Sequence, residues 1–446
     1  MNEIICLFIC MACMLPALII SYFKTGKKLN IITFITVWYV FWCIVSCTKF
    51  CGYVVEFDYG RLYVMSNILV LITVFSITMF NNQAFIGENI KKELIKNNKM
   101  QSSQLVNIAR VVVFFVEIYF LGIVVSQLIQ GKVTIYTLRT AAYASGERAL
   151  FSSMADTIYF VFVKGFVIFD IIFEIVQIVN WRKRPVYFPI INLFIFCLTT
   201  LNRIELVRTI LLVFICIVLT GTSISEILNR NKRLKKIVVF FSMAVALLII
   251  LRYAIKDSKE GMIQSVMSTI FSNFSIPFVT FNRFFLQYLE GVRIVECSIF
   301  DILFSGPIKM LQPFFNLFDI EVFNFNGYLA ERINYAIDIG HNKVFKVNAF
   351  YTMYYNLVNG GGLVIPYFVS GAFGGILGIL YNRWRSRSNN RNLALLIFSI
   401  HVTIYGLLRW EMYAHWSWVT LFLILLFTGK RKFKFCFEQN NSFMKE

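Results

Sequence analysis

Arginine and glutamate residues occur together at two places where they open or separate long apolar runs. Residues 202–208 read NRIELVR and open one such run, and residues 408–416 read LRWEMYAHW and separate the last two. Guanidinium groups bind phosphate through paired hydrogen bonds and keep their charge at physiological pH. A helix N-terminus adds its own preference for anions. The two segments therefore predict a pyrophosphate-binding site that contains Arg203, Arg208 and Arg409.

Acid–base chemistry would need a side chain that accepts a proton beside these arginines. Glu205 precedes Arg208 by three residues and lies on the same side of the expected helix. Glu411 and His341 are the other candidates for a general base. A structural interpretation stays open: Glu205 and Arg208 would form an ion pair at the membrane interface, and residues 408–416 would belong to an interfacial aromatic belt.

The apolar run 155–180 carries a second group of ionisable residues, Lys164, Asp170 and Glu174. Ionisable side chains are costly within a membrane and are usually functional there. We expect either a proton or ion relay, or a buried ion pair with Lys164 or with Glu117.

This chain lacks the motifs that nucleotide-dependent and metal-dependent enzymes usually carry. The sequence contains no P-loop, HExxH, GxSxG or DxD motif. Most of the ten cysteines lie in apolar runs, where they are expected to be small apolar fillers. The sequence therefore predicts no metal site and no cofactor.

The composition indicates an integral membrane protein that forms one domain, 1–446. Of its 446 residues 58% are hydrophobic and only 15% are charged, and the mean hydropathy is +0.69. Soluble domains are about 25% charged. The net charge of +19 could suggest nucleic acid as a partner, but a chain with so little polar surface makes that function improbable, and no nucleic-acid binding is expected.

Apolar segments of membrane-spanning length occur along almost the whole chain, and a bilayer needs roughly 20 apolar residues per helix. They predict an all-α, polytopic transmembrane helical bundle with about eleven spans, in a range of roughly ten to thirteen. Residues 1–254 would hold eight helices, 255–361 a large external segment, and 362–446 three helices and a basic tail. The expected helices are 3–23, 31–47, 63–80, 107–129, 155–180, 186–201, 204–223, 237–254, 362–382, 392–409 and 415–429.

Lysine and arginine cluster in alternate gaps between these helices, for example at residues 91–99, 230–236 and 383–391. Such clusters remain on the cytoplasmic side of a membrane. The sequence therefore predicts an external N-terminus and a cytoplasmic C-terminus. The external side would also carry Arg139 and Arg283, which we expect to add to the pyrophosphate site.

The external segment 255–361 is rich in phenylalanine and is interrupted by proline and polar residues. This pattern predicts amphipathic helices in the outer membrane interface. Within it, residues 266–288 could instead form a re-entrant segment or a pair of short spans. The helix that follows contains overlapping GxxxG pairs, Gly371/Gly375 and Gly374/Gly378, which allow close helix packing.

The layout and two local segments resemble the Wzy family of oligosaccharide repeat-unit polymerases. One segment runs from Leu201 to Thr209, and the other, NAFYTMYY at residues 348–355, is followed by Asn359-Gly360 and the glycine-rich helix. Family members commonly carry an aspartate before that glycine, and Asn359 takes its place here. The resemblance covers most of the chain at the level of layout, with loose motifs.

The resemblance implies a metal-independent glycosyltransferase of the bacterial cytoplasmic (inner) membrane. Such enzymes join polyprenyl-pyrophosphate-linked oligosaccharide units into O-antigen or capsular polysaccharide at the outer face of that membrane, without a cofactor. The implied partners are the lipid-linked oligosaccharide, membrane lipid, a chain-length regulator and a flippase. A glycan ligase of similar layout and, from another class, a flippase of lipid-linked oligosaccharides remain alternatives.

Overall fold

The computed structural model is almost entirely helical. It describes residues 2–48, 59–79, 103–142, 150–179, 187–201, 204–221, 262–291, 297–318, 352–387 and 390–428, together with residues 236, 239, 337–338 and 346–347. The N-terminal half contains α1 (Asn2–Cys13), α2 (Leu15–Thr25), α3 (Ile31–Ser46), α4 (Gly60–Thr78), α6 (Ser103–Ile129), α7 (Ile135–Ala142), α8 (Ser153–Thr157), the π-helical turn η3 (Ile158–Val163), α9 (Lys164–Val179), α10 (Phe188–Thr200) and α11 (Ile204–Thr220).

The C-terminal half brings the last helices and the only strands among the described residues. Its elements are α14 (Met262–Leu289), α15 (Ile299–Asn316), α17 (Met353–Gly361), α18 (Ile365–Arg387), α19 (Asn390–Tyr405), the short 3-10 helix η4 (Glu411–Tyr413) and α20 (His415–Phe427). The strands β1 (Ile337–Asp338) and β2 (Lys346–Val347) form one antiparallel pair. The all-α expectation is thus confirmed for the part of the chain that the structure covers.

Local sequence explains where the first helices begin and end. The side chain of Asn30 accepts hydrogen bonds from the backbone N–H groups of Ile32 and Thr33, at 3.0 and 3.1 Å, and so caps the start of α3. The preceding helix α2 ends at Gly26, whose φ of 67° lies in the left-handed region that glycine tolerates. The turn between α2 and α3 is therefore built from residues suited to it.

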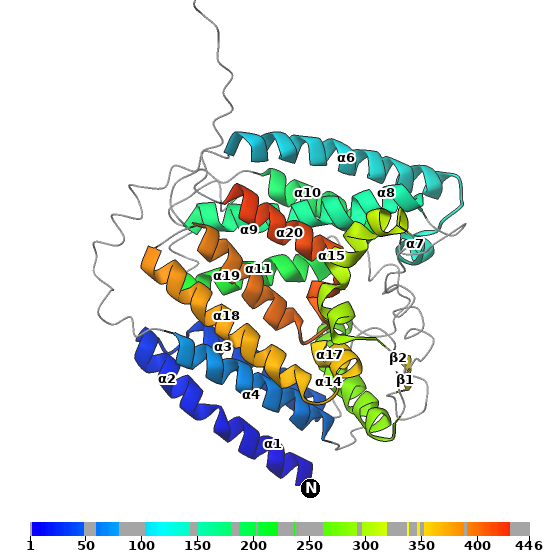
Figure 1. Ribbon diagram of the computed structural model, residues 1–446. Coiled ribbons are helices and arrows are strands. Elements are labelled where there is room, and N and C mark those ends of the chain that lie inside the picture. The colour runs from blue at the N-terminus through cyan, green and yellow to red at the C-terminus, as the bar shows by residue number, and fades with distance from the viewer. Residues whose placement is uncertain are drawn as a thin grey trace, which may run out of the picture.

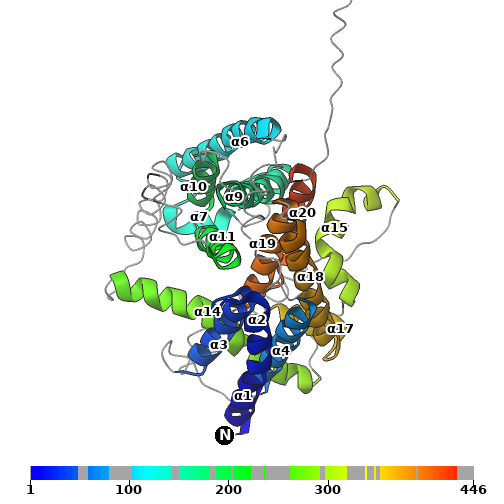
Figure 2. The same cartoon turned by 90° about the vertical axis from the view of Figure 1, so that its left-hand side faces the viewer.

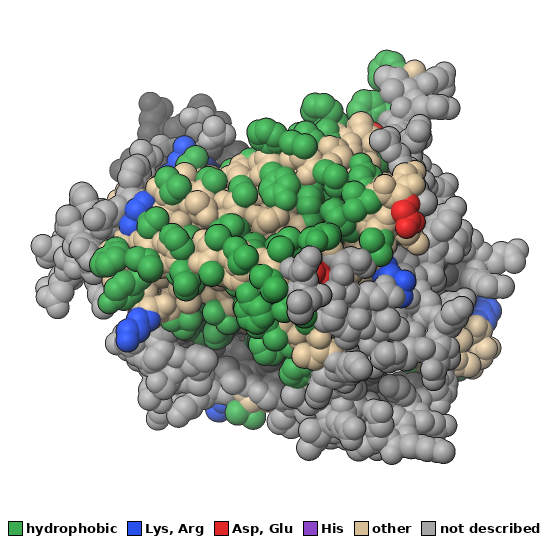
Figure 3. All heavy atoms as spheres, turned by 90° about the horizontal axis from the view of Figure 1, so that it is seen from below, with side chains coloured by type: hydrophobic (Ala, Val, Ile, Leu, Met, Phe, Trp, Pro, Cys, Tyr) green, Lys and Arg blue, Asp and Glu red, His purple; other side chains and the backbone are tan. Residues whose placement is uncertain are grey.

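Four of the described helices are long and apolar enough to cross a membrane: Glu3–Thr25, Gly60–Thr78, Gln104–Ile129 and Ile365–Ser386. Shorter apolar helices include Ile31–Ser46, Phe188–Thr200 and His415–Phe427. Hydrophobic side chains cover most of the described face beside α1 and α2 (Figure 3), where Phe8 and Phe23 are more than half exposed. Such a surface suits contact with lipid, and these features identify a membrane protein.

The long helices lie roughly side by side, while α14 runs across them near one end of the bundle (Figures 1 and 2). The N-terminus lies at the same end as α14, α15 and α17 (Figure 1). The strongest helix pairs join α18 to α4, α20 to α9 and α10 to α6. The bundle therefore brings residues from both halves of the sequence together.

Most expected helices coincide with observed ones to within a few residues, from α3 at 31–46 to α20 at 415–427. The expected helix 3–23 is interrupted at Met14, which separates α1 from α2. The expected helix 237–254 lies outside the described residues, apart from one position. Residues 266–288 belong to one continuous helix, α14, although Pro277 lies inside it.

Helix α14 is more buried than the predicted amphipathic helix in the membrane interface would be. Its phenylalanines include Phe278, Phe281 and Phe284, all fully buried, and the helix packs against α3 and α4. The reason is that aromatic side chains on one helix face gain more from packing against neighbouring helices than from the interface. Helix α14 is therefore an integral part of the bundle.

The packing of α18 on α4 gives a direct test of the GxxxG pairs. A Cβ atom at Gly374 would collide with the carbonyl oxygen of Leu71, whereas at Gly375 the nearest atom, Cγ1 of Val74, would be 4.0 Å away. We expect Gly374→Ala to cost about 1–3 kcal/mol of stability, because the backbones must separate. Gly375→Ala should be neutral or stabilising by up to about 1 kcal/mol. Thermal unfolding of both variants in the same detergent measures the difference, and equal melting temperatures would contradict this packing.

Candidate functional site

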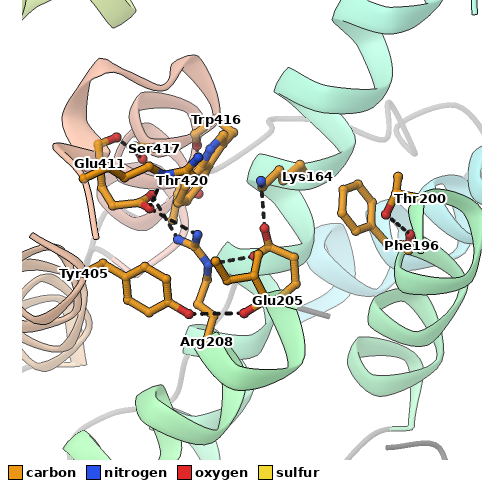
Figure 4. Close-up of polar contacts among 12 residues, drawn as sticks. Lys164, Phe196, Thr200, Glu205, Arg208, Tyr405, Glu411, Trp416, Ser417 and Thr420 are labelled. Atoms are coloured by element: carbon orange, nitrogen blue, oxygen red, sulfur yellow. Dashed lines mark hydrogen bonds and ion pairs between the residues drawn. The ribbon is translucent and has the colours of Figure 1, made fainter. Parts of the chain in front are cut away.

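Five charged side chains from three parts of the chain meet inside the bundle: Lys164 from α9, Glu205 and Arg208 from α11, and Arg409 and Glu411 from the turn between α19 and α20. The Nζ atom of Lys164 lies 2.7 Å from Oε1 of Glu205, whose Oε2 atom lies 2.7 Å from Nε of Arg208. Arg208 donates from Nη1 and Nη2 to Glu411, at 3.2 and 3.4 Å. Nε of Arg409 also donates to Glu411, at 2.9 Å. We call these five residues the charge ladder, most of which Figure 4 shows.

Aromatic rings enclose the central arginine of the charge ladder. The guanidinium carbon of Arg208 lies 4.5 Å from the ring centre of Tyr405 and 4.3 Å from that of Trp416, as Figure 4 shows. Nζ of Lys164 lies 5.0 Å from the same tryptophan ring. These cation–π contacts, together with complete burial of Arg208, fix its guanidinium plane.

Two side chains of α19 complete the surroundings of Arg208. Nε2 of His401 lies 3.3 Å from Nη1 of Arg208, and the hydroxyl of Tyr405 donates to the carbonyl oxygen of Ile204 at 3.1 Å. Sequence reasoning did not select His401. The spacing of four residues between His401 and Tyr405, which puts both on one face of an apolar helix, is a signal that could have found it.

The turn that carries Arg409 and Glu411 is held by hydrogen bonds to α15 and α17. The N–H group of Met353 at the start of α17 donates to the carbonyl oxygen of Gly406 at 2.6 Å. The indole N–H of Trp410 donates to the carbonyl oxygen of Ile302 in α15 at 3.2 Å. Helices α15 and α17 therefore hold the turn in place, and the ion pair between Glu411 and Arg208 joins the turn to α11. These three helices are far from the turn in sequence.

Charges alternate in sign along the ladder, and each carboxylate lies between two cations. Three cations and two carboxylates leave one positive charge in excess. Burial would raise the pKa of Glu411 in the turn, but the guanidinium groups of Arg208 and Arg409 hold that pKa well below its usual range. A carboxylate held in this way is a poor proton acceptor, so the geometry favours a role for Glu411 in positioning the cations. Glu205 likewise lies between two cations, Lys164 and Arg208, and the geometry favours a positioning role for it too.

Arg409 is the most exposed member of the charge ladder. Its side chain is 27% exposed, whereas those of Glu411, Arg208 and Glu205 are buried. Arg409 therefore offers an approaching anion a partly exposed cation that Glu411 already orients. The arrangement is suited to binding a phosphate or pyrophosphate group.

The structure thus unites four of the site residues predicted from the sequence: Glu205, Arg208, Arg409 and Glu411. Arg203 and His341 lie outside the described residues. Arg139 belongs to α7, with its side chain outside the description. The half-buried Arg283 lies on α14, whose main contacts are with α3 and α4, away from the charge ladder. Lys164 joins the site although its sequence position gave no reason to place it there.

The other ionisable residues of α9 form a separate cluster with Arg110 of α6. Nε of Arg110 donates to both carboxylate oxygens of Asp170, at 2.7 and 3.0 Å, and Nη2 donates to Glu174 at 2.8 Å. The expected ion pair with Lys164 is therefore wrong, because Lys164 pairs with Glu205 instead. Within the described ranges, no three His, Cys, Asp or Glu side chains lie together as metal ligands would.

A double-mutant cycle on Lys164 and Glu205 tests the buried end of the charge ladder. Lys164→Met leaves the buried Glu205 with one cation and is expected to cost about 3 kcal/mol of stability. The pair Lys164→Met and Glu205→Gln removes both charges, so we expect a coupling of about 0.5–3 kcal/mol that restores part of the loss. Unfolding in detergent measures all three variants, and strictly additive losses would show that the two side chains do not interact.

Comparison with known proteins gave no match: no protein-family model, curated protein or solved structure matches this chain. The charge ladder is therefore interpreted from its geometry together with the resemblance in layout.

Proposed function

We propose that this protein polymerises polyprenyl-pyrophosphate-linked oligosaccharide units into a bacterial surface polysaccharide, O-antigen or capsule. The observation that carries the proposal is the charge ladder, which offers an excess positive charge and a partly exposed, oriented Arg409. Pyrophosphate is a dianionic or trianionic leaving group, and preorganised cations stabilise the charge that develops on it as it departs. No nucleotide is needed for such a transfer.

We further propose about eleven spans in the bacterial cytoplasmic membrane, with the N-terminus outside and the C-terminus in the cytoplasm. The basic clusters after α2 and in residues 383–391 support this orientation. The N-terminus lies at the same end of the bundle as α15 and α17 (Figure 1), which agrees with an external position for all three. Arg409 would then face the outer side, where lipid-linked units are joined.

In the proposed reaction, a hydroxyl oxygen of the acceptor sugar attacks the anomeric carbon of the donor chain. The bond between that carbon and the pyrophosphate oxygen breaks, and the pyrophosphate leaves with the electron pair. Arg409 stabilises the departing charge directly, the fully buried Arg208 adds its positive charge from within the ladder, and Glu205 and Glu411 keep the cations in position. The hydroxyl proton passes to a base, and His341 is the candidate that remains when both glutamates are engaged by cations.

Deletion of the gene and gel analysis of the surface glycan test the proposal in cells. We expect the deletion to leave single repeat units on the surface or to remove long polymer, and complementation to restore the chain-length ladder. A ladder unchanged by the deletion would overturn the proposal. Loss of every surface glycan while long lipid-linked polymer accumulates in the membrane would indicate a ligase, and accumulation of single units on the cytoplasmic side would indicate a flippase.

A further inference from the structure

Glu117 is a buried carboxyl group in the middle of a membrane-spanning helix. Among the described residues, neither of its oxygens has a hydrogen-bond partner, and the residue is 0% exposed. It lies about midway along the apolar stretch Gln104–Ile129 of α6, roughly 20 Å from either end at 1.5 Å per residue. A carboxyl group without a partner at this depth requires an explanation, because such positions are costly.

Arg110, two turns before Glu117 on α6, cannot compensate a charge on Glu117, because its hydrogen bonds go elsewhere. Arg110 donates to both oxygens of Asp170 and to Glu174, and its Nη1 donates to Asn107 at 3.1 Å. Arg110, Asp170 and Glu174 together already carry one excess negative charge. An ionised Glu117 would add a second negative charge to this part of the bundle.

Lys164, at the start of α9, is the described cation on the other helices packed against this part of α6, and it is engaged by Glu205, 2.7 Å from its Nζ atom. Asp170 of α9 and the Cys197 thiol of α10 lie within electrostatic range of Glu117. The ring of Phe120, one turn along α6, packs against Tyr159 of η3 with 4.4 Å between ring centres. Glu117 therefore has a carboxylate and a thiol within electrostatic range and no free cation among the described residues, and a buried group in such surroundings neutralises itself by binding a proton.

We propose that Glu117 is a membrane-embedded proton-binding site, whose proton is held beside the carboxylate cluster of Asp170, Glu174 and Arg110. The ligand is a proton rather than a metal cation, since the described side chains offer no set of metal ligands around it. This site is separate from the charge ladder, and the inference does not rest on the proposed polymerase activity.

A lipid-soluble carbodiimide tests the proposal on the purified full-length protein. A protonated carboxyl adds to the reagent: its oxygen bonds to the central carbon, its proton moves to a nitrogen, and the adduct rearranges to a stable N-acylurea. We expect dicyclohexylcarbodiimide to modify Glu117, as mapped by peptide mass spectrometry, and a water-soluble carbodiimide to modify it several-fold less. Absence of the adduct at Glu117, or equal modification by both reagents, would overturn the proposal.

Three comparisons sharpen this experiment. Glu117→Gln should lose the adduct while it keeps the elution volume of the folded protein. Asp170→Asn removes a neighbouring negative charge and leaves Arg110 less compensated, so Glu117 ionises more readily and should react several-fold more slowly. A merely structural Glu117 would react at the same rate in both backgrounds. Protection of Glu117 by sodium ions, at constant ionic strength, would show that the site binds a metal cation and would contradict a proton site.

Discussion

Replacing Arg208 by alanine is expected to abolish polymer formation and to destabilise the protein by about 3–5 kcal/mol, because a buried ion pair loses its central cation. Arg208 is fully buried, contacts Glu205 at 2.7 Å and Glu411 at 3.2 Å, and lies between two aromatic rings. Without it, each carboxylate keeps only one cation. Thermal unfolding in detergent measures the stability, and the chain-length ladder of complemented cells measures the activity.

Arg208→Lys separates the two effects. Lysine restores the charge but lacks the planar fork that contacts both carboxylates at once, so we expect part of the stability to return while polymer length stays strongly reduced. If Arg208→Ala left both the melting temperature and the polymer ladder unchanged, the charge ladder would have neither a structural nor a functional role.

Arg409→Ala should also cause a large loss of activity, but only a small loss of stability. Glu411 keeps Arg208 as a partner in this variant, and the partly exposed Arg409 side chain contributes only one ion pair within the charge ladder. If Arg409 stabilises the departing pyrophosphate, its removal should lower the transfer rate about 10²–10³-fold, as the loss of one preorganised donor does in other enzymes. Polymer formed per unit time in membranes, corrected for protein amount, measures the effect.

Arg391→Ala is the matched control for Arg409→Ala. Arg391 lies at the start of α19, whereas Arg409 follows the end of the same helix, and it donates to the carbonyl oxygen of Leu425 at 2.7 Å. The proposed orientation puts Arg391 on the cytoplasmic side, so its loss should leave the transfer rate nearly unchanged. Equal losses in the two variants would indicate a general effect of removing an arginine from this helix.

The positions of the helices could be predicted from the sequence because apolar length is a local property of the chain. The segments 31–47 and 415–429 correspond closely to α3 and α20. The break at Met14 was not predicted, since the apolar run continues through it and only Pro16, in the first turn of α2, marks the change. A continuous apolar run predicts where a helical stretch begins and ends, but it does not predict a break within that stretch.

Site residues could be predicted where charge and helix ends coincide in sequence, as for Arg208 and Glu411. Their partners could not, because pairing between α9, α11 and the α19–α20 turn depends on how the helices pack. An ion pair of Asp170 with Lys164, six residues away on the same helix, was one of the alternatives, but Lys164 pairs with Glu205 of α11, and Arg110 of α6 pairs with Asp170. A buried ion pair is selected by three-dimensional proximity, which a single sequence does not show.

The most direct test of the proposed function is polymerisation by the purified protein. Cells that lack the gene should accumulate single lipid-linked units, and these can be extracted and mixed with the full-length protein in detergent or liposomes, without nucleotide or added metal. We predict products of two or more repeat units together with free polyprenyl pyrophosphate, and formation of these products about 10²–10³-fold more slowly with folded Arg409→Ala protein. A folded, stable protein that forms no linked units from this substrate, or that forms them only when a nucleotide is added, would contradict the proposal.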